Sequence, residues 1–319
     1  MKKYYPIDLS KVRTYELKYR KNIINIKDFA KPIPENASFD DFLNSIPNIL
    51  VGKNFKLIIE RVYQAYKKKR AIVFAMGAHV IKCGLGPIII DLMKRGIITA
   101  IAFNGASAIH DFEIALIGET SESVSYYLKT GDFGMARETG EYINDAIIDG
   151  CKKNIGMGKA LGEKIYELKP KYQDYSILYW AYKLEIPLTV HVAIGTDITH
   201  MHPKADGSSI GKSTFTDFKL LVSIVKELND GGIWFNIGSA VILPEIFLKT
   251  FNLARNIGYK IENFTTVNFD KIAHYRPTQN VIKRPTLEVG TGIQIIGQHE
   301  LLIPLLAKFI IEKIGNDEK

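Results

Sequence analysis

IAFNGASAIHDFE, residues 101–113, contains the end of a strand, a turn and the start of a helix in one short segment. The apolar run ITAIAF (98–103) stops at Asn104-Gly105, and an amphipathic helical pattern resumes after it. A buried strand that leads directly into a helix is the repeating unit of a parallel sheet. The Gly, Ser, His and Asp at the break allow two interpretations, a turn with a helix cap or a binding site at the end of a strand.

The same arrangement recurs along the chain. Short β-rich runs, most of them followed by a Gly- or Asn-bearing turn and then a helical pattern, occur at 71–76, 98–103, 186–194, 232–237, 263–267 and 292–297. Alternating strands and helices predict an α/β fold in three α/β/α layers, with a mostly parallel, Rossmann-like sheet of about six strands. A further helix is predicted at about 53–69, and residues 120–175 read as helical and loop-like without a strand.

The chain is predicted to have an N-terminal arm and one domain. Residues 1–50 look irregular, and no linker divides residues 51–319, which we expect to form a single domain. No apolar run is long enough to cross a membrane, and the basic N-terminus lacks the apolar core of a signal peptide. Two cysteines, Cys83 and Cys151, are too few for a disulfide framework. A cytoplasmic enzyme without a membrane partner fits these features.

The net charge of +8 does not indicate a nucleic-acid partner. The lysines are spread along the chain, and no basic stripe with interleaved aromatic residues stands out. Solvated faces are therefore the favoured interpretation of the basic residues. A modest positive field is compatible with an anionic ligand such as a dinucleotide.

Histidines gather at one predicted edge of the sheet. Of the seven, six lie just beyond the carboxyl end of a predicted strand, and His191 lies inside one. Ligands of open α/β sheets bind outside the carboxyl ends of the strands. Each histidine alone reads more simply as a structural or surface residue, but the group favours a site.

Small residues follow the same strands. They are Gly77-Ala78, Asn104-Gly105-Ala106-Ser107, Gly195-Thr196 and Gly238-Ser239. Each alone fits an ordinary βα turn, whereas together they favour a cradle in which backbone amides approach a phosphate or a ribose. No complete G-x-G-x-x-G is present, and GSSIGKS (207–213) has the wrong spacing for a phosphate-binding P-loop.

The ordered set of these segments resembles deoxyhypusine synthase and its bacterial relatives over about residues 70–310. Residues 77–113 resemble that family's first nucleotide-binding strands, whose Ser-Ser-Gly, Thr-Ala-Gly-Gly and Glu-Glu-Asp motifs fall on 82–84, 104–107 and 109–111. YWAYKLEIPL (179–188) is similar to the family's approach to the next strand. Further similarities are Thr196-Asp197, the glycine-bearing segment from Gly238, Phe269-Asp270, Tyr275-Arg276-Pro277 and the final helix at LLIPLL (301–306).

The resemblance implies an NAD-binding domain that assembles as a homodimer or homotetramer with sites near subunit interfaces. The family oxidises a polyamine with NAD and transfers an aminobutyl group through an imine on a lysine. The cofactor set implied for this chain is Gly77, Gly84, Asn104, Gly105, Ala106, Ser107, Gly238, Ser239, Asp270 and Gln298. The substrate-binding set is Asp111, Thr196, His274 and Arg276.

The chain departs from that family at its reactive residues. The family's Trp-Gly-Lys falls on Lys283-Arg284-Pro285, so proline occupies the position of the catalytic lysine. The Lys-His pair expected after Val241-Ile242 is Leu243-Pro244, and an expected glutamate is His110. We therefore do not expect a genuine deoxyhypusine synthase.

Three functions follow from the sequence. The first is an NAD-dependent transferase or oxidoreductase that acts on a small amine or amino-acid-like molecule, with a catalytic set of His110, Asp197, His200, His202 and Lys283. The second is a metal-dependent hydrolase or lyase that uses His191, Asp197, His200 and His202. The third is a dinucleotide-binding protein without catalytic activity.

Overall fold

The computed structural model describes residues 1–317 and divides the chain into two units, Met1–Lys53 and Asn54–Lys319. The first unit contains three single 3₁₀ turns and the helix α1 (Phe39–Ser45). Ser38 and Asp41 form a capping box at the start of α1, because each side chain accepts a hydrogen bond from the other residue's backbone N–H. The second unit contains all six strands and is described from here on by itself.

The six strands form one parallel sheet. They are β1 (Ile72–Met76), β2 (Ala100–Asn104), β3 (Leu188–His191), β4 (Ile233–Ile237), β5 (Phe264–Asp270) and β6 (Gly290–Ile296). Their order in the sheet is β3-β2-β1-β4-β5-β6, and every pair is parallel. The chain moves outward from β1 through β2 to β3 and then returns to the other side of β1 with β4. The order of the strands therefore reverses between β1 and β4, which is the point where doubly wound folds bind ligands.

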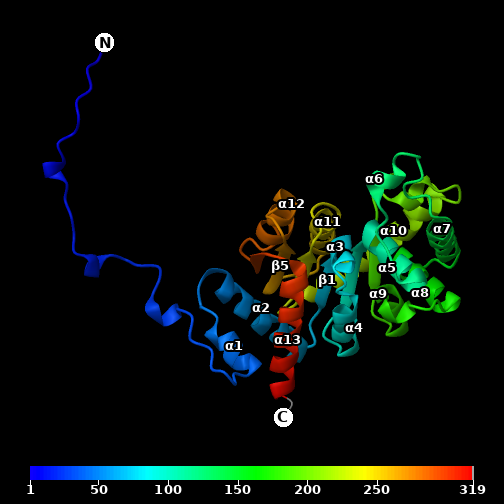
Figure 1. Cartoon of the computed structure of the whole chain (residues 1–319), viewed down its shortest axis with the longest axis horizontal. Coiled ribbons are helices and arrows are strands. Elements are labelled where there is room, and N and C mark those ends of the chain that lie inside the picture. Colours follow the sequence, from blue (N-terminus) through cyan, green and yellow to red (C-terminus); the bar gives the residue numbers. More distant parts are fainter. Residues whose placement is uncertain (318–319) are drawn as a thin grey trace. The chain divides into compact units, whose positions relative to one another are not determined.

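Helices connect and cover the strands (Figure 1). They are α2 (Leu50–Lys67), α3 (Ala78–Lys82), α4 (Gly86–Lys94), α5 (Gly105–Ile117), α6 (Val124–Tyr127), α7 (Arg137–Lys152), α8 (Met157–Leu168), α9 (Ile177–Lys183), α10 (Gly207–Val225), α11 (Ile242–Asn256), α12 (Tyr275–Pro277) and α13 (His299–Asp317). Short turns of 3₁₀ helix lie at Gln173–Tyr175, Ile198–Met201 (η5) and Lys226–Leu228, and Thr278–Lys283 is π-helical. The segment from α5 to α10 gathers at one end of the sheet, beside β3 (Figure 1).

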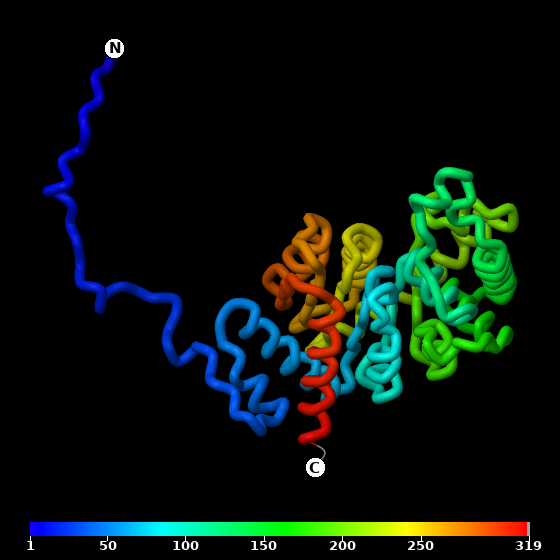
Figure 2. The backbone as a smooth tube through the Cα atoms, in the orientation of Figure 1, coloured from blue at the N-terminus to red at the C-terminus, as the bar shows by residue number. Residues whose placement is uncertain are grey.

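Both faces of the sheet are buried. On one face Trp234 of β4 stacks on Phe247 of α11 with ring centroids 4.4 Å apart, within a cluster that also includes residues of α10. Alternate residues of the strands point to the other face, where Phe74 and Phe235 are fully buried 4.6 Å apart. The helices α2 and α13 lie side by side, as Figure 2 shows. Strands buried on both faces explain why the sequence shows continuous apolar runs rather than alternation.

The fold class predicted from the sequence is confirmed. All six expected runs form strands, and α2 covers the helix expected at about 53–69. Residues 120–175 contain helices and turns and no strand, as expected. Within residues 1–317, none of the helices combines the length and the apolar character that crossing a membrane requires.

Candidate functional site

The turns after β1 and β4 touch at the carboxyl edge of the sheet. A Cβ atom on Gly77 would lie 2.1 Å from the carbonyl oxygen of Gly238, so no larger residue fits there without a backbone shift. Gly238 has a φ of +63°, a left-handed conformation that favours glycine. These two predicted cofactor residues therefore come together at the strand reversal, where Gly77 is buried and Gly238 is partly exposed.

Two histidines meet above these turns. The Nδ1 atoms of His79 and His299 lie 2.9 Å apart, although the residues are 220 positions apart in the chain. Sequence reasoning did not select either residue individually. The available signal was that both follow the carboxyl end of a strand, which places them at the same edge but does not reveal that they touch.

The start of α5 uses its polar side chains in hydrogen bonds within the protein. Asn104 caps the helix by accepting the backbone N–H of Ser107 at 2.9 Å. The Ser107 hydroxyl is buried and contacts both Asn104 Oδ1 and the carbonyl oxygen of Met76, at 2.6 and 2.8 Å. These side chains join the ends of β1 and β2, and of the next two residues Gly105 is buried and Ala106 is partly exposed.

Asp197 lies against the first residue of α5. A Cβ atom on Gly105 would lie 1.9 Å from Asp197 Oδ2, so the carboxylate rests directly on the glycine. Oδ2 is buried and has no hydrogen-bond partner among the described residues. Burial raises the pKa of this carboxyl group, although the nearby His200 opposes that shift. An unpaired buried carboxylate oxygen is an acceptor suited to a hydroxyl or ammonium donor of a ligand.

The loop after β3 fixes His200 and Thr196 by local hydrogen bonds. His200 Nδ1 accepts the backbone N–H groups of Gly195 and Asp197, at 3.1 and 3.3 Å. The remaining Nε2 of neutral His200 then carries the proton and lies 3.9 Å from Asp197 Oδ2. Because its one free lone pair is already used, His200 is badly placed to accept a proton. The Thr196 hydroxyl donates to the Ala193 carbonyl at 2.7 Å.

The four residues of the metal-site hypothesis do not converge. His191 is buried in β3 with Nε2 2.9 Å from the Thr189 hydroxyl, and burial lowers its pKa to about 3. The ring of His202 instead packs on Gly140 in α7. In the described part of the chain, no three His, Cys, Asp or Glu side chains gather as a metal ion requires. The structure therefore does not bring His191, Asp197, His200 and His202 together, and the metal-dependent alternative stays a prediction.

Asp111 is a buried helix cap, which contradicts its predicted role in substrate binding. Its carboxylate accepts hydrogen bonds from the Ser176 hydroxyl and from the backbone N–H groups of Ile177 and Leu178, at 2.6 to 2.9 Å. Burial raises its pKa to about 6 despite these hydrogen bonds. The side chain is 1% exposed, so it holds α9 rather than a ligand. Gly84 lies nearby, on the wall of a cavity of about 470 Å³ between α3 and α5.

The remaining predicted residues lie around β4, β5 and β6. The Ser239 hydroxyl accepts the backbone N–H of Leu243 at 3.3 Å. Asp270 lies 3.8 Å from His274, and Arg276 lies 3.3 Å from Glu245 of α11. The backbone of Gln298 accepts the first hydrogen bonds of α13. Lys283 is exposed at the end of the π-helical segment, and no buried pocket surrounds it as an imine-forming lysine requires.

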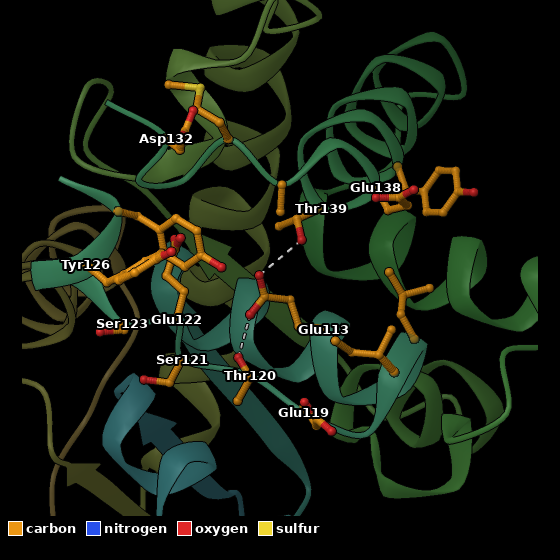
Figure 3. Close-up of a pocket in the computed structure, with 16 residues that line it drawn as sticks. Glu113, Glu119, Thr120, Ser121, Glu122, Ser123, Tyr126, Asp132, Glu138 and Thr139 are labelled. Carbon is orange, nitrogen blue, oxygen red and sulfur yellow. Dashed lines mark hydrogen bonds between the residues drawn. The ribbon is translucent and has the colours of Figure 1, made fainter. Parts of the chain in front are cut away.

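A second part of the candidate site is a cavity of about 980 Å³ between α5, α6 and α7 (Figure 3). Its sixteen lining residues include five carboxylates and three tyrosines and no Lys, Arg or His. They are Glu113, Glu119, Glu122, Asp132, Glu138, Tyr126, Tyr127 and Tyr142. Sequence reasoning did not find this cavity, because its walls come from the helical segment in which no motif stood out. We refer to it below as the acidic cavity.

Glu113 is held in place in the acidic cavity by two hydroxyl groups, as Figure 3 shows. Thr120 donates to Oε2 at 2.5 Å, and Thr139 of α7 donates to Oε1 at 3.0 Å. Because the Thr120 hydroxyl donates to Glu113, its contact of 2.6 Å with His110 Nδ1 requires that this nitrogen carries the proton. Burial raises the pKa of Glu113, but hydrogen bonds with His110, Thr120 and Thr139 outweigh it and lower the pKa overall. Glu113 is therefore a fixed carboxylate.

The loop that carries Asp197 also supports the acidic cavity. Gly134, beside the cavity residue Met135, packs on Ile198 and Met201 of η5. Asn144 of α7 donates to the carbonyl oxygen of Thr199 at 3.0 Å. One loop thus contacts the start of α5 on one side and the wall of the acidic cavity on the other, so the two parts of the site share a support.

Comparisons with known proteins show the fold. No family model matches the sequence, and no curated protein matches it. Among solved structures, a protein of Entamoeba histolytica assigned as a deoxyhypusine synthase has a TM-score of 0.52 at 11% identity, with 89% of this chain and 96% of that chain covered. A conserved protein of Methanococcus maripaludis S2 assigned to the LOR/SDH type has a TM-score of 0.50 at 19% identity, with 88% and 74% covered.

AgrE in a ternary complex with ornithine and NAD⁺ has a TM-score of 0.51 at 15% identity, with 83% of this chain covered. The chain spans 34% of AgrE, so any likeness concerns only part of that protein. At these identities the comparisons establish a shared architecture and no shared activity. The fold implied by the resemblance to the deoxyhypusine synthase family is confirmed in this sense.

Proposed function

We propose that this chain binds NAD at the carboxyl edge of its sheet and acts on a small cationic amine held in the acidic cavity. The acidic cavity carries the proposal, because its lining holds five carboxylates and no basic side chain. Glu138 is paired with Arg137 at 2.7 Å, so the other four carboxylates supply the charge that attracts a cation and repels an anion. The tyrosine faces add favourable contacts for an ammonium group. AgrE, which shares the fold, was solved with ornithine and NAD⁺, which supports the pairing of these two ligand classes.

The residues at the sheet edge fit a dinucleotide in two respects. The reversal of strand order lies between β1 and β4, and the turns at Gly77 and Gly238 meet there. The unpaired Oδ2 of Asp197 would accept a hydroxyl group of a ribose. When bound, NAD supplies a hydride acceptor.

The protein's own residues would bind and orient the amine. Glu113 would pair with the ammonium group, and its two threonine partners prevent it from rotating away. His110 would act through Thr120, because its Nδ1–H donates to the same hydroxyl that donates to Glu113. The role of His110 in proton transfer stays a prediction. Lys283 has no part in the proposal, because its side chain is exposed.

Calorimetric titration tests the two halves separately. We expect NAD to bind in the absence of amine, and 1,4-diaminobutane to bind at least tenfold more tightly than the uncharged 1,4-butanediol. Removing the charge with Glu113→Gln should weaken diamine binding by about 10- to 100-fold, the worth of a charge-assisted hydrogen bond. The matched control is Glu167→Gln, the same change at an exposed glutamate that does not line the cavity.

The outcomes separate the claims. Equal affinity for the diamine and the diol, or an unchanged affinity in Glu113→Gln, would overturn the assignment of the acidic cavity. Failure to bind NAD would overturn the assignment of the sheet edge. Formation of NADH from NAD and a panel of diamines and basic amino acids, monitored by absorbance, then identifies the reaction.

A further inference from the structure

The histidine pair at the strand reversal has a defined proton arrangement. His299 Nε2 lies 3.1 Å from the carbonyl oxygen of Phe269, which can only accept a hydrogen bond. His299 must therefore carry a proton on Nε2, and in its neutral form Nδ1 holds a lone pair. The same carbonyl oxygen also accepts the N–H of Gly238 at 3.0 Å, so both of its lone pairs are used.

This arrangement fixes the tautomer of His79 as well. Its Nδ1 lies 2.9 Å from His299 Nδ1. Because His299 Nδ1 holds a lone pair, His79 Nδ1 must be the donor. The lone pair of neutral His79 is then on Nε2. Three groups thus form one directed chain, from His79 to His299 to the carbonyl oxygen of Phe269, with a basic nitrogen at its outer end.

The surroundings keep His79 neutral. Burial lowers its pKa, and the positive charge of Lys271 and the neighbouring His299 act in the same direction. The charged and titratable groups that face it are Cys83, Asp270, Lys271, His299 and Glu300. Burial and Glu300 raise the pKa of Cys83, so this cysteine keeps its S–H proton. An uncharged imidazole with a free lone pair is the form that accepts a hydrogen bond.

We propose that His79 Nε2 accepts a hydrogen bond from a hydroxyl group of the dinucleotide bound at the strand reversal. The proposal rests on the proposed function for the presence of a dinucleotide at this edge. It adds the residue that accepts this hydrogen bond and so orients the ligand.

Cys83 lies beside the ring of His79. Its sulfur is 3.3 Å from His79 Nδ1 and 3.6 Å from Nε2, and its S–H donates to Glu300 Oε2 at 3.7 Å. Because the thiol proton is directed at Glu300, the lone pair of Nε2 is left for a ligand. A ligand hydroxyl group is a stronger donor than a thiol.

The proton arrangement is tested by nitrogen NMR of the histidine rings in the full chain, with two substitutions at position 299. Wild type should show His79 protonated on Nδ1 alone at neutral pH. In His299→Gln the side-chain amide can donate to Phe269 and its oxygen can accept from His79, so the same tautomer should persist. His299→Leu removes the acceptor, and His79 should then populate the Nε2–H tautomer. A charged His79, or an Nε2–H tautomer in wild type, would overturn the proposal.

Acylation with diethyl pyrocarbonate tests whether the lone pair faces the ligand. The reagent modifies a neutral imidazole nitrogen, so mass spectrometry should find His79 modified and His299 protected. Saturating NAD should slow the modification of His79 at least threefold. Unchanged modification in the presence of bound NAD would overturn the role of His79 while leaving the NAD site intact. If calorimetry shows that NAD does not bind, the proposed function fails, and the NMR tautomer still decides the arrangement of the pair.

Discussion

The two parts of the candidate site shift the pKa values of their titratable groups for opposite reasons. At the edge of the sheet, burial favours the neutral forms of the titratable groups: the pKa values of His191 and His79 are lowered, and that of Asp197 is raised. In the acidic cavity, hydrogen bonds outweigh burial and lower the pKa of Glu113. The difference lies in the neighbours: His110 and two threonine hydroxyl groups lower the pKa of Glu113, whereas no described hydrogen-bond donor points at Asp197 Oδ2.

The contrast teaches what each part can bind. Surroundings that disfavour charge, with hydrogen-bond acceptors such as Asp197, suit a molecule rich in hydroxyl groups. A fixed carboxylate among other acids suits a cation. A redox reaction between a dinucleotide and an amine needs both environments in one protein, and the loop that contains Asp197 and η5 lies between them.

The largest expected effect concerns the neutral His191. Its pKa is about 3 in the folded protein against an ordinary 6.5, so its contribution is present above pH 6.5 and is lost as the pH falls. Between about pH 7 and pH 4, the free energy of unfolding of wild type should fall by about 3 kcal/mol more than that of His191→Gln. Urea unfolding at several pH values measures the difference. His274→Gln, at a partly exposed histidine, should follow wild type.

A smaller effect is expected where the turns meet. Gly238→Ala places a Cβ atom 2.9 Å from His299 Cε1 in a left-handed conformation, and should lower the free energy of unfolding by about 1–2 kcal/mol. Gly211→Ala in α10 is the control, because no atom lies within 4 Å of its Cβ position and its helix favours alanine. If both variants were equally stable, the close packing at this edge would be disproved.

Next in size is the effect of the unpaired carboxylate oxygen. Asp197→Asn should weaken NAD binding about tenfold, which corresponds to about 1.4 kcal/mol for the loss of one hydrogen bond. Calorimetry compares it with Asp149→Asn, where the aspartate is exposed and pairs with Lys152. Equal affinities in the two variants would show that Asp197 does not contact NAD. The contrast between the two parts of the site would then not reflect a difference in the ligands they bind.

The smallest effect is expected for the pH dependence in the acidic cavity. Glu113 has a lowered pKa, so it stays ionised well below neutral pH and its attraction for a cation is lost only in acid. The affinity for 1,4-diaminobutane should change less than about twofold between pH 8 and pH 6. A steep decrease over this interval in both wild type and His110→Gln would show that Glu113 titrates there and that its hydroxyl partners do not keep its pKa low.

The sequence predicted the fold well because local patterns determine it. Apolar runs, glycine-bearing turns and helical periodicity indicated six strands. A parallel sheet then places the carboxyl ends of these strands at one edge. The prediction that Gly77 and Gly238 belong to one site follows from this topology alone, and the structure brings them into contact.

Side-chain contacts between distant residues could not be predicted in this way. Asp111 lies beside a plausible site in the sequence, but its partners are backbone groups of α9, and only the packed fold reveals them. The acidic cavity joins residues of three helices whose relative packing no local pattern encodes. Metal ligands were proposed from the closeness of His200 and His202 in the chain, yet the turn η5 sends their rings to different neighbours.

The carbonyl oxygen of Phe269 has a consequence for the order in which the site forms during synthesis. It accepts one hydrogen bond from the turn after β4 and one from His299, at the start of α13. His79 leaves the ribosome 220 residues before His299 does. For that interval the nascent chain has a first histidine without its partner, and the tautomer of His79 is undetermined. His79 Nδ1 gains its hydrogen-bond acceptor only when α13 packs against the sheet. The tautomer of His79 is therefore set in the same step that completes the fold.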